Sequence, residues 1–126
     1  MMDILVVDDS EMNRQLLIST LKKAGVQNDI HQAEDGEGAL KILKKKHKKL
    51  CLVFLDWQLP GIDGLEVLKQ MAQDKNMKEL PIIMLTSAKS PESEEIAQLL
   101  NPNLKSFIMK PLDPEKIVEI SLPLIE

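Results

Sequence analysis

The stretch LVFLDWQLPGIDG, residues 52–64, decides the fold class of this chain. Its first four residues, Leu52 to Leu55, are apolar, as is typical of a short strand buried on both faces of a sheet. The run stops at a carboxylate, Asp56, and a Pro60-Gly61 pair soon follows, which indicates an open loop. This stretch therefore predicts a buried strand whose carboxyl end carries a charged group facing an open approach.

Similar runs and helical patterns alternate along the rest of the chain. The other strand-like runs are 4–7, 30–33, 82–85 and 107–109. Apolar residues at helical spacing predict helices between them, and the first helical pattern contains Met12, Leu16, Leu17, Leu21 and Ala24. Helix N-caps are predicted at Ser10, Asp63, Ser90 and Asp113, the second helix starts near Asp35 or Gly36, and Gly25 ends the first. Five strand-helix units predict an α/β fold with a doubly wound, five-stranded parallel sheet.

Composition narrows the class of protein further. The chain has 126 residues, 44% of them hydrophobic and 29% charged, which suits one globular domain spanning residues 1–126. A formal net charge of -4 disfavours direct binding of nucleic acid. The single cysteine, Cys51, lies in an apolar run, which favours a buried structural thiol. No apolar stretch approaches the roughly 20 residues of a membrane span and no signal peptide pattern is present, so we expect a cytoplasmic chain without membrane insertion.

Polar side chains follow four of the expected strands, at the point where each strand ends. They are Asp8-Asp9, Asp56, Thr86-Ser87 and Lys110. In an open parallel sheet, ligands bind at the carboxyl ends of the strands, so these groups should meet at one edge. Three carboxylates in one place repel each other unless a cation compensates them. Oxygen ligands without histidine or cysteine favour Mg²⁺ or Mn²⁺.

An alternative for each of these acids is a turn or capping residue that simply follows a strand. That interpretation would be preferred for one aspartate alone, but the three acids are joined by a hydroxyl and a lysine at matching positions. A lysine at this edge would place its charge against phosphate oxygens, and a carboxylate would accept the phosphoryl group. Asp56 is the best candidate acceptor because it is the lone acid at the end of the central run.

Asp8-Asp9, Asp56, Thr86-Ser87-Ala88 and Lys110-Pro111, in this order and spacing, resemble the receiver domain of two-component response regulators. The resemblance covers essentially the whole chain and is to the single-domain, chemotaxis-regulator type. It implies the flavodoxin-like (CheY-like) fold, for which the strand order 2-1-3-4-5 is taken from the family.

The resemblance implies a role for each acid. Asp56 would accept a phosphoryl group from a histidine kinase or a phosphotransfer protein. Asp8, Asp9 and Asp56, with the backbone carbonyl of Gln58, would hold Mg²⁺ or Mn²⁺. The Lys110-Pro111 peptide bond would be cis.

The resemblance also implies phosphoryl contacts and a switch. Lys110, the Thr86 hydroxyl and the backbone N–H of Ala88 would stabilise the phosphoryl group. Thr86 and Phe107 would form the switch, and Gln58 and Ala88 would tune the lifetime of the phosphorylated state. The alternative for Phe107 is an ordinary core phenylalanine, since it has no hydroxyl group.

Phosphorylation would then change the surface of the fourth helix, fifth strand and fifth helix, roughly residues 90–100 and 105–123, and so control a downstream protein. We expect a signalling phosphoacceptor rather than an enzyme, active as a monomer or a phosphorylation-dependent dimer. A receiver fragment of a longer regulator and a phosphorylation-independent interaction module are the alternatives.

An aspartyl-phosphate enzyme would need a second general acid near Asp56, which Trp57-Gln58 does not offer. A nucleotide- or flavin-binding domain would need a glycine-rich loop where Asp8-Asp9-Ser10 stands.

One segment departs from the family pattern. Receivers often carry a Gly-Ala type of turn before the fifth strand, whereas this chain has Asn101-Pro102-Asn103-Leu104-Lys105-Ser106. Because asparagine tolerates the left-handed conformation, a turn is still expected there.

Overall fold

The computed structural model describes residues 1–87 and 91–125, with side chains left undescribed also at residues 91 and 92. Five strands and five α-helices alternate along it. The strands are β1 (Asp3–Val7), β2 (Ile30–Ala33), β3 (Leu50–Asp56), β4 (Ile82–Thr86) and β5 (Leu104–Met109). The helices are α1 (Glu11–Lys23), α2 (Gly36–Lys46), α3 (Gly64–Gln73), α4 (Pro91–Leu100) and α5 (Pro114–Ser121), and short 3₁₀ helices follow α2 and α5 at η1 (His47–Lys49) and η2 (Leu122–Leu124).

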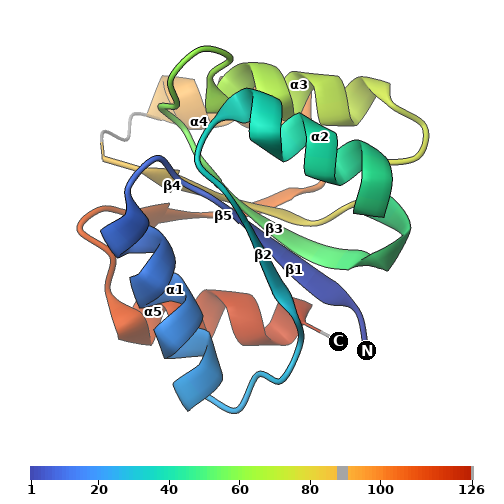
Figure 1. Cartoon of the computed structure of the whole chain (residues 1–126). Coiled ribbons are helices and arrows are strands. Elements are labelled where there is room, and N and C mark those ends of the chain that lie inside the picture. The colour runs from blue at the N-terminus through green and yellow to red at the C-terminus, as the bar shows by residue number, and fades with distance from the viewer. Residues whose placement is uncertain (88–90, 126) are drawn as a thin grey trace.

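All strand pairs are parallel, and the sheet order is β2-β1-β3-β4-β5. This order confirms the predicted fold. The sheet lies between two layers of helices, with α1 and α5 on one face and α2, α3 and α4 on the other (Figure 1). Every residue of β3 is buried, which explains why its sequence is continuously apolar up to Asp56.

Neighbouring residues along a strand point to opposite faces of the sheet and pack against different helical layers. On β3, Val53 and Leu55 belong to the core under α2 and α3, whereas Leu52 and Phe54 belong to the core under α1 and α5. Cys51 lies in the second of these cores and is 8% exposed, which confirms that it is a buried thiol. The core is therefore a pair of aliphatic layers that hold the strand ends in fixed register.

The helix starts largely follow the predicted caps. The side chains of Ser10, Asp35, Asp63 and Asp113 each accept a hydrogen bond from a backbone N–H in the first turn of their helix. Gly25 has a φ of 97°, the left-handed conformation expected of a residue that ends a helix. The predicted cap at Ser90 lies outside the described residues.

The apolar pattern of α1 predicted its buried face only in part. Met12 is 80% exposed and Ala24 is also exposed, whereas Thr20 is buried beside Leu17 and Leu21. Met12 lies on the same side of the helix as the exposed residues Ser19 and Lys23, so it faces away from the core. The helical spacing was right, but Met12 does not belong to the side of the helix that packs on the sheet.

The turn before β5 is built differently from the expectation. No described residue other than glycine has a positive φ, so Asn101 and Asn103 do not use the left-handed conformation. The fully buried Asn101 accepts a hydrogen bond from the Asn103 N–H at 2.9 Å, and its Nδ2 donates to the Leu68 carbonyl at 3.1 Å. The turn is therefore an Asx turn that is tied to the middle of α3.

Candidate acidic site at the carboxyl edge of the sheet

The structure brings the predicted polar groups together at the carboxyl edge of the sheet. Asp8 follows β1, Asp56 ends β3, Thr86 ends β4 and Lys110 follows β5. Val7 pairs with Leu55, so Asp8 and Asp56 come next on adjacent strands. Asp8 is 0% exposed, Asp56 is 3% exposed and Thr86 is 4% exposed. The carboxyl groups of Asp8 and Asp56 are therefore largely shielded from water.

Asp56 is held in place by its backbone as well as by its neighbours. Gly64, the first residue of α3, donates its N–H to the Trp57 carbonyl at 2.9 Å. A Cβ atom at Gly64 would collide with the backbone carbonyl of Asp56, so only glycine allows α3 to start this close to the strand end. The loop of residues 57–63 consequently returns to the carboxyl end of β3, where Asp56 lies.

Lys110 bridges the two buried acids. Its Nζ lies 2.9 Å from Asp56 Oδ2 and 3.2 Å from Asp8 Oδ2. Burial lowers the pKa of this ammonium group, but the hydrogen bond to Asp56 and the charges of both acids outweigh it, and the pKa is raised. Lys110 is therefore a fixed positive charge. The Lys110-Pro111 peptide bond is cis, the conformation that the resemblance implies.

The Asp56 carboxylate is harder to ionise than an ordinary aspartate. Its pKa is raised from 3.8 to about 6, mainly because the group is buried; the hydrogen bond from Lys110 opposes this rise and the negative charge of Asp8 adds to it. The remaining oxygen, Oδ1, accepts a bond from the Gln58 N–H at 3.4 Å. A positive charge added at this edge would favour the ionised form of Asp56.

The acids have the arrangement and chemistry of a site for a small hard cation. Asp8, Asp9 and Asp56 each offer one carboxylate oxygen, and these oxygens lie within 4.8 Å of one another. Asp8 and Asp56 are buried whereas Asp9 is exposed, so the group is open to solvent on one side. Oxygen ligands alone suit Mg²⁺ or Mn²⁺, which bind few carboxylates and keep several waters. The residues present thus fit the expected ion.

Asp8 has further partners that the sequence did not predict. Its Oδ1 accepts from the Ser10 N–H at 2.9 Å, its Oδ2 accepts from Asn13 Nδ2 at 3.3 Å, and its backbone carbonyl accepts from Arg14 Nη1 at 2.6 Å. The signal for these contacts was present, because a helix that starts at Glu11 turns its first polar side chains back toward the end of β1. It was missed because Asn13 and Arg14 look like ordinary exposed helix residues.

The candidate switch residues lie on one face of the sheet. Phe107 pairs with Met84, two residues before Thr86 on β4, so both side chains point toward the α3 and α4 layer. Phe107 is only partly buried, and its ring packs against Trp57 with centroids 6.4 Å apart and planes tilted by 33°. Phe107 is thus neither a free surface ring nor a fully buried core residue. The predicted contact at Ala88 lies outside the described residues.

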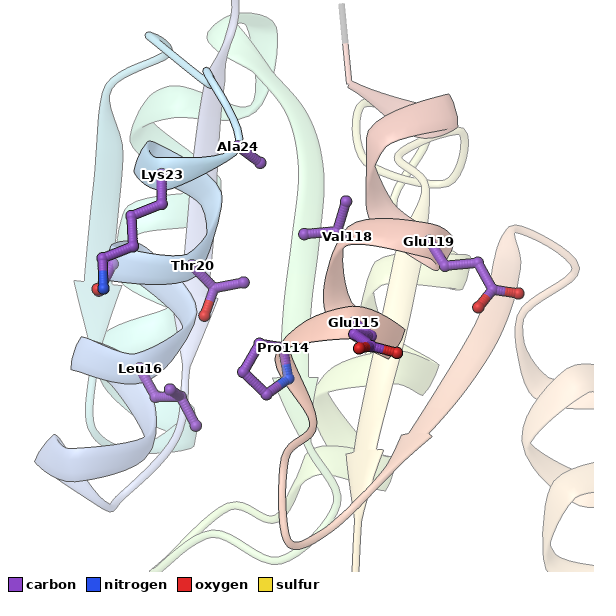
Figure 2. A pocket seen from close by; sticks show the side chains of 9 residues that line it. Leu16, Thr20, Lys23, Ala24, Pro114, Glu115, Val118 and Glu119 are labelled. Carbon is purple, nitrogen blue, oxygen red and sulfur yellow. The ribbon is translucent and has the colours of Figure 1, made fainter.

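A large surface groove lies away from the acidic edge. It runs between α1 and α5, has a volume of about 560 Å³, and is lined by Leu16, Thr20, Ala24, Pro114 and Val118 among others (Figure 2). Asp8, Asp9, Asp56 and Lys110 are not among the residues that line it. The groove and the acidic edge are therefore separate features, and the group of Asp8, Asp9, Asp56 and Lys110 belongs to the acidic edge.

Across the described residues, no helix has the length and apolar character needed to cross a bilayer.

Fold and site together define a class of protein, a parallel α/β domain that gathers carboxylates and one lysine at the ends of its strands. Residues 4–121 match the family model of the response regulator receiver domain. The chain belongs to that family, as the sequence resemblance indicated.

Individual relatives agree with this assignment. The chain is 33% identical over 118 residues to a chemotaxis protein CheY homolog of Campylobacter jejuni, covering 94% of this chain and 88% of that protein. It is 41% identical over 116 residues to the alkaline phosphatase synthesis transcriptional regulatory protein PhoP of Bacillus subtilis, covering 90% of this chain and 44% of PhoP. The solved structure of chemotaxis response regulator CheY4 of Vibrio cholerae superposes with a TM-score of 0.86 at 29% identity, covering 99% of both chains.

Proposed function

We propose that this chain is a phosphoryl-accepting signalling protein, in which Asp56 receives a phosphoryl group from a histidine kinase or a phosphotransfer protein. The observation that best supports this proposal is the position of the Asp56 carboxylate. It is buried at the end of β3, with Lys110 Nζ 2.9 Å away and Asp8 beside it. A turn or cap residue needs neither this burial nor a shared lysine.

The transfer is a displacement at phosphorus. One oxygen of the Asp56 carboxylate forms a bond to phosphorus while the P–N bond to the donor imidazole breaks. The imidazole keeps the electron pair of that bond and takes up a proton. Lys110 turns from the acid pair to the phosphoryl oxygens, whose charge its ammonium group stabilises, and the Thr86 hydroxyl hydrogen-bonds the same group. Loss of the phosphoryl group is the attack of water on phosphorus, which returns the Asp56 carboxylate and inorganic phosphate.

Asp8, Asp9 and Asp56, with the Gln58 carbonyl, would hold Mg²⁺ or Mn²⁺. When bound, the ion supplies positive charge that offsets the charge of the acids and of the phosphoryl oxygens. The three carboxylate oxygens within 4.8 Å of one another support this assignment. The raised pKa of Asp56 supports it as well, since a cation at this edge would keep the acceptor ionised at neutral pH.

The output of the modification is a change in shape, not the turnover of a substrate. Movement of Thr86 toward the phosphoryl group frees space on the face that it shares with Phe107, and the Phe107 ring shifts into that space. The surface of α4, β5 and α5 then binds a partner protein differently. Exposed apolar side chains on this surface, Ile96, Leu99 and Met109, support a protein partner.

The comparisons favour output through protein contact. The Campylobacter and Vibrio proteins that match this chain over most of their length are chemotaxis proteins, whereas PhoP is a transcriptional regulator of which this chain covers 44%. We infer a cytoplasmic protein that acts as a monomer or a phosphorylation-dependent dimer. A receiver fragment of a longer regulator would carry out the same chemistry.

The direct test is incubation of the purified chain with acetyl phosphate, with and without Mg²⁺, followed by intact mass measurement beside an Asp56→Asn variant. The expected result is a Mg²⁺-dependent gain of one phosphoryl group in the wild type and none in the variant. Calorimetry would show whether Mg²⁺ binds, and a stable phosphoryl mimic would exclude fast hydrolysis. If the wild type gained no phosphoryl group under these controls, the proposal would be contradicted in favour of a phosphorylation-independent interaction module.

A further inference from the structure

The Asp8 carboxylate is fully buried and is held by three donors among the described residues. The Ser10 N–H donates to Oδ1 at 2.9 Å, whereas Oδ2 is shared by Lys110 Nζ at 3.2 Å and Asn13 Nδ2 at 3.3 Å. Because Asp8 is 0% exposed, bulk water is poorly placed to replace a lost donor.

The two donors to Oδ2 differ in what else they do. Lys110 is also bonded to Asp56 Oδ2, and in the proposed reaction it turns to the phosphoryl oxygens on Asp56. Once Lys110 has turned, Asn13 is the side chain left on Asp8 Oδ2. A buried carboxylate that loses one of its donors at this stage would tend to rotate, and its orientation would be lost.

Asn13 itself is anchored independently of Lys110. Its backbone N–H donates to the Ser10 side chain at 3.2 Å, in the capped first turn of α1. The next residue, Arg14, holds the Asp8 backbone carbonyl at 2.6 Å and Gln32 Oε1 at 3.0 Å. The start of α1 is thus tied to both the side chain and the backbone of Asp8 while the lysine moves.

We propose that Asn13 is a positioning residue, which keeps the Asp8 carboxylate oriented toward the cation while Lys110 passes from the acid pair to the phosphoryl group. This inference rests on the proposed function of Asp56. The neutral amide suits the task, because a second cation at this position would compete with the metal ion and a carboxylate would add a fourth negative charge.

The test is a double-mutant cycle read by Mg²⁺ binding in isothermal calorimetry, with no phosphoryl group present. Asn13→Leu keeps the size of the side chain and removes the donor, and Lys110→Met places Asp8 in the state left after the lysine has turned. The bond from Asn13 is long, at 3.3 Å, so its contribution should be that of an ordinary hydrogen bond, and its removal should weaken Mg²⁺ binding roughly 3- to 10-fold in the wild-type background. The loss should be larger in the Lys110→Met background, because Asn13 is then the remaining side-chain donor.

Matched variants separate positioning from folding. Gln15→Leu, on the exposed side of the same helix, is the control and should bind Mg²⁺ like the wild type. Asn13→Gln keeps an amide donor and should recover part of the affinity. In acetyl phosphate assays, Asn13→Leu should raise the Mg²⁺ concentration needed for half-maximal labelling far more than it lowers the rate at saturating Mg²⁺. Equal thermal stability of Asn13→Leu and Gln15→Leu would show that the chain is folded.

The outcomes distinguish the two proposals. The role of Asn13 would be overturned if Asn13→Leu bound Mg²⁺ as tightly as Gln15→Leu. It would also be overturned if Asn13→Leu weakened Mg²⁺ binding equally in the wild-type chain and in the Lys110→Met chain. Either result would leave the phosphoacceptor proposal standing. A wild-type chain that never gains a phosphoryl group, yet binds Mg²⁺ in an Asn13-dependent way, would overturn the proposed function and keep Asn13 as the residue that positions Asp8. A wild-type chain with no Mg²⁺ binding would overturn both.

Discussion

The indole of Trp57 packs against the ring of Phe107, with centroids 6.4 Å apart and planes tilted by 33°. The two residues come from different parts of the site, since Trp57 directly follows Asp56, the proposed acceptor, and Phe107 lies on β5. The contact therefore joins the strand that would be phosphorylated to the strand whose surface would meet a partner. It gives the site an optical reporter within the chain.

We expect phosphorylation to change the emission of Trp57 because Phe107 shifts away from it or turns over it. In a Phe107→Leu variant the change on addition of acetyl phosphate and Mg²⁺ should fall to less than about half of the wild-type value, while mass measurement still shows full labelling. Met109→Leu, on the same strand and 43% exposed, is the control and should behave like the wild type. Identical emission changes in all three proteins would mean that Phe107 does not move.

Replacing Asp56 by asparagine should stabilise the chain at neutral pH in the presence of a chelator. The folded state raises the pKa of Asp56 from 3.8 to about 6, so it binds the proton more tightly than the unfolded state. Stability conferred at this position is therefore present at low pH and is lost as the pH rises from about 4 through about 6. Each unit of pKa difference corresponds to about 1.4 kcal/mol, so a gain of about 1–3 kcal/mol is expected for Asp56→Asn at pH 7.

Urea denaturation between pH 4 and pH 7 measures this effect. The difference between wild type and Asp56→Asn should become small near pH 4, where the wild-type carboxyl group is protonated in the folded state and partly protonated in the unfolded state. Glu95→Gln, at an exposed position on α4, controls for the change in net charge. Adding Mg²⁺ should stabilise the wild type and not the variant, because binding to the folded state alone raises stability. A difference that grew as the pH fell would mean that folding does not raise the pKa of Asp56.

Gly64→Ala should destabilise the fold and disturb the acceptor. The added Cβ would meet the Asp56 carbonyl, so either α3 or the end of β3 has to move, at a cost of about 1–3 kcal/mol. Chemical denaturation measures the loss, and the labelling rate with acetyl phosphate should fall as well. Gly38→Ala is the matched control in α2, since its Cβ would meet only side-chain atoms, the nearest being Asp35 Oδ1 at 3.0 Å. A Gly64→Ala variant as stable and as active as Gly38→Ala would refute the steric argument.

Asn101→Ala should destabilise the chain by about 2–3 kcal/mol. The substitution removes the bond to the Leu68 carbonyl and leaves the Asn103 N–H without its acceptor, at a residue that is fully buried. Asn76→Ala, an exposed asparagine in the loop after α3, should cost little and serves as the control. The midpoint of urea unfolding distinguishes the two, and an equal midpoint would show that the Asx turn contributes nothing.

The sequence was most informative where one physical rule decides the structure. Apolar runs predicted β1, β3 and β4, β2 was predicted from the weaker run at Ile30–Ala33, and the polar residues that follow the strands predicted the acidic edge. Apolar character alone was a poorer guide on α1. Met12 was grouped with the apolar residues of this helix, but it lies on the exposed side that also carries Ser19 and Lys23.

The sequence did not predict which residues from distant segments contact each other. The bond from Asn101 to Leu68 and the bond from Asn13 to Asp8 depend on where helices lie relative to strands, which no local pattern encodes. The sharing of Lys110 between two acids was likewise not predictable in detail, although the family resemblance indicated that Lys110 belongs to the site.

The full burial of β3 has a consequence for the chain before it has folded. In the unfolded state its first six residues, Leu50 to Leu55, form an uncharged segment of high strand propensity, the kind that stacks into intermolecular aggregates. Charged side chains stand immediately on either side, with Lys48 and Lys49 before the segment and Asp56 after it. Such flanking charges act as gatekeepers, because stacked copies of the segment would bring like charges together. The lysines of η1 and the Asp56 carboxylate would therefore oppose aggregation of the unfolded chain, a role separate from any signal the folded chain carries.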